Sequence, residues 1–194
     1  GILLAVPFAL EWWSAVRESS IADLKTWPQE KLFRPALGMT LIPLGLASYM
    51  SFLWVLRGDP LYFSHVQIFW DRHLAAPWTS VWHSWQIIAH APDGQIVANQ
   101  ALELSFTALM IAVLLGGFRR LRPSYWWYMA LSILVPMSTS SLMSMPRFAL
   151  VLFPMFVVLA LWGERHPVNN AIVAFSLPLL GLFTVLFADW YWVA

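Results

Sequence analysis

The chain has 194 residues, of which 60% are hydrophobic and 11% are charged, and its mean hydropathy is +0.66. Soluble domains carry about 25% charged residues, so this composition indicates a membrane protein. The net charge of +1 excludes a basic nucleic-acid-binding protein, and the lack of cysteine excludes disulfides, thiolate catalysis and Cys-ligated zinc.

The first apolar segment, residues 1–13, reads GILLAVPFALEWW. No basic region precedes it and no small-residue cleavage site follows it, so it is not typical of a signal peptide. Its apolar run is about half of the roughly twenty residues that a membrane span needs. We expect it to be the remnant of a span, and the chain to be the C-terminal part of a longer protein.

Five further segments are predicted to cross the membrane, at about residues 36–56, 97–118, 125–143, 147–162 and 171–188. The apolar region 125–162 is too long for one span and is interrupted by PMSTSSLMSMPR. We therefore predict a hairpin of two short helices that turns near residues 138–147. The whole chain is expected to form one all-α, polytopic transmembrane bundle.

The basic residues predict the orientation of these spans. Alternating the sides places eight of the 11 Lys and Arg residues on one face: Arg17, Lys25, Lys31, Arg34, Arg119, Arg120, Arg122 and Arg165. The other face receives Arg57, Arg72 and Arg147. By the positive-inside rule the first face is cytoplasmic, so the loop 57–96, the turn 138–147 and the C-terminus are predicted to lie outside.

The outer loop, residues 57–96, is predicted to contain two amphipathic helices on the membrane surface. The first follows the turn GDP, with Asp59 as its N-cap and Pro60 in its first position. Its apolar side is formed by Phe63, Val66, Phe69, Trp70 and Leu74. The second helix is expected to begin at Pro77 and carries an aromatic stripe of Trp78, Trp82 and Trp85.

Arg147 is an ionisable residue between two apolar stretches. Ser144 is expected to cap the helix that follows, with Pro146 near its start, so the helix N-terminus and the guanidinium would form a phosphate site. The alternative is an arginine that only reaches for the lipid headgroups. Glu103, inside the predicted span 97–118, either pairs with a group on another helix or is neutral and hydrogen-bonded.

Other candidate groups lie in the outer loop. His65, His73, His83 and His90 lack the spacing of a helical zinc site, so no metal site is predicted, and hydrogen bonding to substrate or interface is expected instead. Gln67 and Asp71 share a helical face that can hold a sugar hydroxyl or simply face solvent. The predicted substrate-binding residues are Asp59, His65, Gln67 and Arg147.

Three segments together resemble a known family. GILLAVPFALEWW, GMTLIPLGLASYMSFLWVLRGDPLYFSHVQIFWDRHLAAPW and SMPRFALVLFPMFVVLA follow in order and spacing the bacterial relatives of GPI mannosyltransferase two. These are multi-span glycosyltransferases of the GT-C type. The resemblance covers nearly the whole chain, and the patterns GDPL.F...Q..W and PRF.L..FP are fairly specific in combination.

The resemblance implies transfer of a sugar, expected to be mannose, from a polyprenyl-phosphate donor to an acceptor glycan, lipid or protein outside the bacterial plasma membrane. It implies no cofactor beyond this donor. It also implies a carboxylate general base in a first outer loop upstream, which no part of this chain matches, so the chain alone is expected to be inactive. A membrane transporter and a non-catalytic scaffold subunit are the alternatives.

Overall fold

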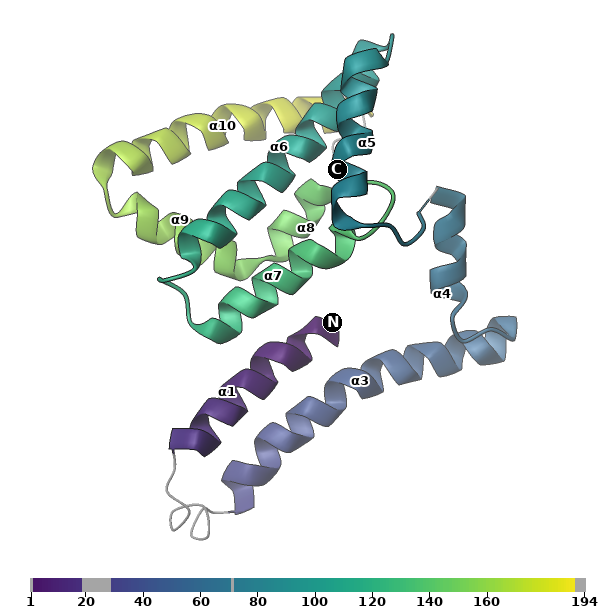
Figure 1. The fold of residues 1–194 in the computed structure, drawn as a ribbon, viewed down its shortest axis with the longest axis vertical. Helices are drawn as coiled ribbons and strands as arrows, with labels where there is room; N and C mark the ends of the chain where they lie inside the picture. Colours follow the sequence, from purple (N-terminus) through teal and green to yellow (C-terminus); the bar gives the residue numbers. More distant parts are fainter. Residues whose placement is uncertain (1, 19–28, 71, 191–194) are drawn as a thin grey trace. The chain divides into compact units, whose positions relative to one another are not determined.

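The computed structural model describes residues 2–18, 29–70 and 72–190 (Figure 1). This part of the chain is helical, as predicted, and no strand occurs in it beyond one isolated bridge between Leu74 and Thr139. The fold divides into two compact units. The first unit contains residues 1–73 and 122–131, and the second contains residues 74–121 and 132–194.

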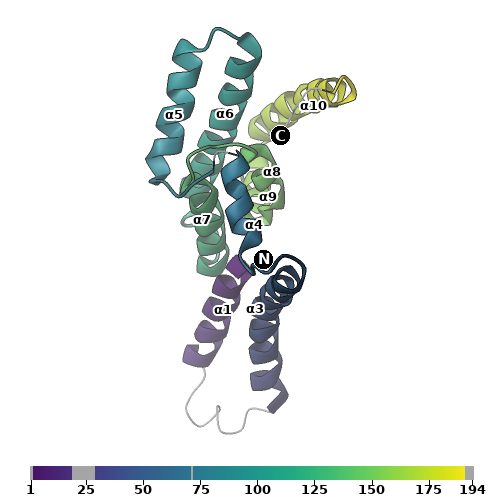
Figure 2. The ribbon, with the colours of Figure 1, turned by 90° about the vertical axis from the view of Figure 1, so that its right-hand side faces the viewer.

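The first unit pairs two helices of the N-terminal segment. Its elements are η1 (Ile2–Leu4), α1 (Ala5–Glu18), α3 (Gln29–Arg57), α4 (Tyr62–His65), η2 (Val66–Trp70) and residues 123–131 of α7 (Pro123–Met137). Helix α1 packs beside α3 (Figures 1 and 2). Glu11 of α1 accepts a hydrogen bond from the buried Ser124 hydroxyl, and its carboxylate lies 3.9 Å from the Arg122 guanidinium. These contacts tie α1 to the start of α7.

The second unit is built around α6. Its elements are α5 (Pro77–His90), α6 (Gly94–Gly117), residues 132–137 of α7, α8 (Met145–Val151), α9 (Phe153–Gly163) and α10 (His166–Ala188). Helices α5, α8 and α9 all contact α6, and α10 contacts α9. The buried core includes Met110, Val113, Leu142, Met145, Leu152, Met155 and Val158.

Proline defines the start of most helices in this region. Proline occupies the first or second position of α5, α7, α8, α9 and α10, as Pro77, Pro123, Pro146, Pro154 and Pro167. Its missing N–H costs nothing there, because the first amide groups of a helix have no partner within the helix. Helix α6 begins differently, since the Asp93 side chain accepts a hydrogen bond of 2.8 Å from the Gln95 N–H.

Two glycines let α6 approach α9 closely. A Cβ added at Gly117 would lie 2.8 Å from Cγ2 of Val158, and one added at Gly116 would overlap the indole ring of Trp162. Val158 and Trp162 are one helical turn apart, so they form one face of α9. Side chains larger than hydrogen at these two α6 positions would separate the helices.

Three helices are long and apolar enough to cross a membrane: Leu37–Arg57 within α3, Gly94–Gly117 and His166–Ala188. They match three of the predicted spans, and the chain is a membrane protein. The other two predicted spans differ. Helix α7 has 15 residues and is about 22 Å long, short of a hydrocarbon core of about 30 Å. Helices α8 and α9 are long and apolar enough to cross a membrane only when they are taken together, and a bend of 76° separates them.

The outer loop differs from its prediction in two ways. Its first helix begins at Tyr62 instead of Pro60 and changes after His65 into the 3-10 turn η2. Its second helix begins at Pro77 as predicted, but α5 lies beside α6 and runs in the opposite direction (Figures 1 and 2). Antiparallel neighbours share one axis direction, so α5 does not lie in the membrane plane if α6 crosses the membrane.

Candidate functional site

The carboxylate of Glu103 holds the N-terminus of α8. Glu103 lies on α6 and is only 6% exposed. Its Oε1 accepts a hydrogen bond of 2.8 Å from the Ser144 N–H, and its Oε2 accepts one of 2.7 Å from the Met145 N–H. Both oxygens therefore satisfy backbone donors at a helix start, where negative charge is favoured by the helix dipole. Glu103 therefore contacts the start of another helix, and its partners there are backbone groups.

Ser144 connects Glu103 to Arg147. Its backbone is left-handed, with φ of 74°, and its hydroxyl makes no capping bond to α8. Ser144 does hold the predicted N-cap position of α8, but its side chain does not cap the helix, because its backbone is not in the extended conformation of a usual N-cap and Pro146, in the second position, has no N–H to donate. The Ser144 hydroxyl instead accepts a hydrogen bond of 2.7 Å from Nη2 of Arg147. The buried acid thus fixes the backbone of a residue whose side chain orients the exposed guanidinium.

This arrangement changes the predicted phosphate site. A phosphate at the α8 N-terminus would compete with Glu103 for the same two N–H groups, and the carboxylate would repel it. Helix α8 also has only seven residues. What remains for an anion is the guanidinium of Arg147, whose side chain reaches the surface.

The turn that carries this cluster is tied to the start of α5. The Ala75 N–H donates to the Ser138 carbonyl at 3.1 Å, and the buried Ser80 hydroxyl donates to the Met137 carbonyl at 3.0 Å. Within the turn, Oγ1 of Thr139 lies 2.7 Å from the Pro136 carbonyl oxygen. Carbonyl groups at the end of α7 are therefore satisfied by Ala75, just before α5, and by Ser80 in its first turn, and the turn has a defined shape.

Asp59 and His65, in the first unit, form a second polar pair. Oδ2 of Asp59 lies 2.6 Å from Nδ1 of His65, and Oδ1 accepts a hydrogen bond of 2.9 Å from the Leu61 N–H. The bond from His65, followed by that from the Leu61 N–H, lowers the pKa of Asp59 below its usual value. Asp59 does not cap α4, whose N-cap is Leu61; its side chain closes a local turn instead.

The structure brings some of the predicted substrate-binding residues together and leaves others apart. Asp59 and His65 form a pair, whereas the Gln67 amide makes only a long contact of 3.4 Å to the Phe63 carbonyl. These three residues belong to the first unit, and Arg147 belongs to the second. Asp71, the predicted neighbour of Gln67, lies outside the described residues. No group of three His, Asp or Glu side chains that could hold a metal occurs in the described ranges.

The tryptophan stripe of α5 forms an exposed apolar surface. Trp78, Trp82 and Trp85 are 74%, 61% and 58% exposed. Together with Val81 of α5 and Leu104 of α6 they line a shallow depression of about 550 Å³. The indoles therefore face outward from the α5–α6 pair, as expected for anchors in lipid headgroups and also for platforms that stack on a sugar ring.

The chain was compared with protein-family models, with curated proteins and with solved structures, and none of the three comparisons finds a match. The function proposed below therefore rests on the contacts of the chain's own residues and on the resemblance of its sequence segments.

Proposed function

We propose that the chain is part of a GT-C type membrane glycosyltransferase in the bacterial plasma membrane. The enzyme would transfer mannose from a polyprenyl-phosphate donor to an acceptor glycan, lipid or protein on the outer side. The observation that supports this proposal most directly is the exposed guanidinium of Arg147, which Ser144 orients in the first turn of α8, the second of two short apolar helices. A planar cation at the end of a membrane hairpin suits the phosphate of a lipid-linked donor.

In the proposed reaction, an acceptor hydroxyl attacks the anomeric carbon of the sugar. The bond between that carbon and the phosphate oxygen breaks, and its electron pair goes to the phosphate, which gains negative charge. Arg147 would stabilise that charge as it develops, so its contact strengthens in the transition state. The hydroxyl proton passes to a carboxylate base, which the resemblance places upstream of this chain.

Glu103 is unsuited to be that base. Its two oxygens accept hydrogen bonds from the Ser144 and Met145 amides, and its side chain is buried. A base must reach the proton that it removes, within about 3 Å or through one water. We assign Glu103 the role of holding α8 and, through Ser144, of orienting Arg147.

A transporter is the second candidate, because one observation favours it. The apolar pair α8 and α9 is bent by 76° at Leu152. Broken helices of this kind often surround the substrate site of secondary transporters. A transporter would move a solute in sealed vesicles without any covalent change, whereas the proposed transferase would release polyprenyl phosphate and make a new glycosidic bond.

The proposal is tested by sugar transfer in membranes that contain the full-length protein at matched amounts. With polyprenyl-phosphate mannose as donor, Arg147→Ala should lower the rate roughly 30- to 1,000-fold, which corresponds to about 2–4 kcal/mol of lost transition-state stabilisation. Arg147→Lys should be almost as slow, since an ammonium keeps the charge but not the two-pronged geometry. Arg119→Lys, an exposed arginine at the predicted cytoplasmic face, is the matched control and should keep the full rate.

Each contrary outcome removes a defined part of the proposal. Full activity of Arg147→Lys would exclude two-pronged phosphate binding, and full activity of Arg147→Ala would remove Arg147 from the site. Solute uptake by the wild type without release of polyprenyl phosphate would favour the transporter.

A further inference from the structure

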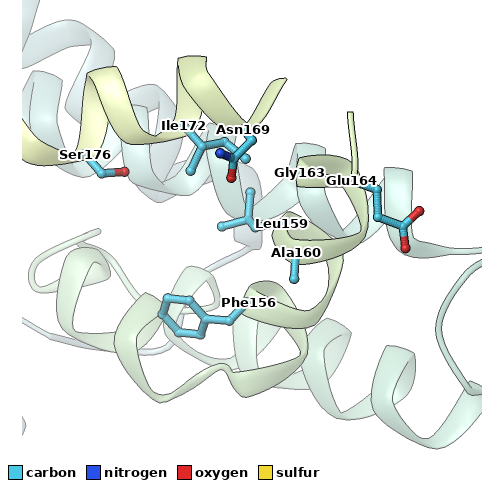
Figure 3. A pocket seen from close by; sticks show the side chains of 8 residues that line it. All are labelled: Phe156, Leu159, Ala160, Gly163, Glu164, Asn169, Ile172 and Ser176. Atoms are coloured by element: carbon cyan, nitrogen blue, oxygen red, sulfur yellow. The ribbon is translucent and has the colours of Figure 1, made fainter. Parts of the chain in front are cut away.

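Helices α9 and α10 form a groove that the proposed reaction does not use. The turn at residues 164–165 joins them, and facing sides of the two helices line a space of about 490 Å³ (Figure 3). Phe156 and Leu159 from α9 and Ile172 from α10 make its walls apolar. Figure 3 shows these side chains directed into the space between the two helices.

Three polar side chains also line this groove: Glu164, Asn169 and Ser176. None of them forms a side-chain hydrogen bond or an ion pair with another residue in the described part of the chain. Other hydroxyls on apolar helices do have partners, as Thr184 donates to the Leu180 carbonyl at 2.7 Å. Asn169 and Ser176 lie on the candidate span His166–Ala188, where a polar group is costly without a hydrogen-bond partner, so they favour an occupant with polar groups of its own.

The setting of the groove identifies the class of that occupant. Helix α10 is one of the three candidate spans, and no residue of its apolar window is buried. The rest of the second unit leaves its sides open, so a groove along α10 opens to the bilayer if this helix crosses the membrane. The polar end of the groove lies at the helix turn, where headgroups are found, and its apolar walls continue along the two helices. An amphipathic lipid has the same distribution of polar and apolar parts.

We propose that this groove binds one glycerophospholipid with a zwitterionic, ammonium-bearing headgroup. Charge complementarity favours this headgroup: the Glu164 carboxylate at the rim suits the ammonium, and the neighbouring Arg165 suits the phosphate. Asn169 lies one turn beyond Arg165, roughly 6 Å deeper along the helix. This is about the depth of the ester carbonyls, which can accept hydrogen bonds from the Asn169 amide.

The test is native mass spectrometry of the full-length protein released from nanodiscs, and its readout does not depend on catalytic activity. The discs contain phosphatidylethanolamine, phosphatidylcholine and phosphatidylglycerol in equal amounts. We expect one retained lipid per chain, with phosphatidylethanolamine preferred because its ammonium also donates N–H bonds. Glu164→Gln should lower this preference about threefold, as expected for one exposed charge pair.

Two matched variants locate the lipid. Ala160→Phe adds a ring at an exposed position that lines the groove, and it should abolish retention. Ala174→Phe adds the same ring to an exposed α10 position that does not line the groove, and it should retain the lipid as the wild type does. If Ala160→Phe does not yield folded protein by size exclusion, the smaller Ala160→Leu serves in its place.

The proposal is overturned if both phenylalanine variants retain lipid equally, because the lipid then lies elsewhere. Equal retention of the three headgroups would remove Glu164 and Arg165 as the basis of selection. A wild-type dimer that Ala160→Phe converts to monomer would assign the groove to a second copy of the chain. None of these measurements depends on sugar transfer, so a failure of the lipid proposal and a failure of the proposed function can be distinguished.

Discussion

Replacing Glu103 by Gln should destabilise the protein although the two side chains have nearly the same shape. The carboxylate accepts hydrogen bonds from two backbone N–H groups, and each of its oxygens serves one of them. The Gln amide has one acceptor oxygen, and its NH₂ group is a donor. One of the two N–H groups would therefore face another donor at a buried position.

The size of the effect follows from these two bonds. Leaving one buried N–H without an acceptor costs about 1–3 kcal/mol, and replacing a charged acceptor by a neutral one in the other bond costs about 1 kcal/mol more. The sum is about 2–4 kcal/mol of unfolding free energy. For a chain of this length, 1 kcal/mol shifts the unfolding midpoint by about 2–4 °C, so a decrease of roughly 5–15 °C is expected.

The assay is thermal unfolding of the purified protein in a mild detergent, followed by tryptophan fluorescence. Asp189→Asn is the matched control, since Asp189 is exposed and its side chain bonds to no other described residue. Its midpoint should stay close to that of the wild type. An unchanged midpoint for Glu103→Gln would refute the reasoning, because the carboxylate would then contribute nothing to holding α8.

Three further predictions concern packing, ionisation and topology. Gly117→Ala should lower the unfolding free energy by about 1–3 kcal/mol, because the added methyl group clashes with α9. Gly181→Ala is the control and should not lower the unfolding free energy, since a Cβ at Gly181 meets open space. Equal unfolding midpoints for the two variants would contradict close packing of α6 against α9. Because the pKa of Asp59 is lowered in the folded protein, its contribution to stability is present above pH 3.8 and is lost as the pH falls through the pKa of the folded state. The difference in unfolding midpoint between wild type and Asp59→Asn should therefore be present at neutral pH and vanish in acid. A cysteine at the exposed position Ser64 should react with an impermeant reagent added to intact cells, whereas one at the exposed position His166 should react only after the membrane is opened. Labelling of both in intact cells would contradict the predicted orientation.

The sequence predicts those features that depend on local composition. Apolar length locates the three long helices, and Pro77 marks the start of α5 because proline favours the first helical turn. The polar stretch after Met137 marks a turn, and the structure has α7 end at Met137 and α8 begin at Met145. Each of these features is determined by a short run of neighbouring residues.

Features that depend on distant residues were not predicted. Glu103 and Ser144 are 41 positions apart, and no local pattern states that a carboxylate on α6 will cap α8. An acidic residue in an apolar helix indicates that it has a polar partner, but the sequence does not show which residue that partner is. The bend at Leu152 is likewise not encoded by its neighbours. Pro154 indicates that a helix starts there, but it does not determine the angle of 76° between α8 and α9. That angle depends on how α8 and α9 each pack against α6.

The contact between Glu103 and α8 also gives a physical reason for the short, bent pair. A seven-residue helix is too short to be stable by itself, because its unpaired end groups are a large fraction of its backbone. The carboxylate satisfies two of those groups, and burial of Met145 and Ala149 fixes the apolar side of the helix. The same contacts leave Arg147 exposed and oriented through Ser144. A short helix held in this way presents a cation at a fixed place, which is what recognition of a phosphate by a single side chain requires.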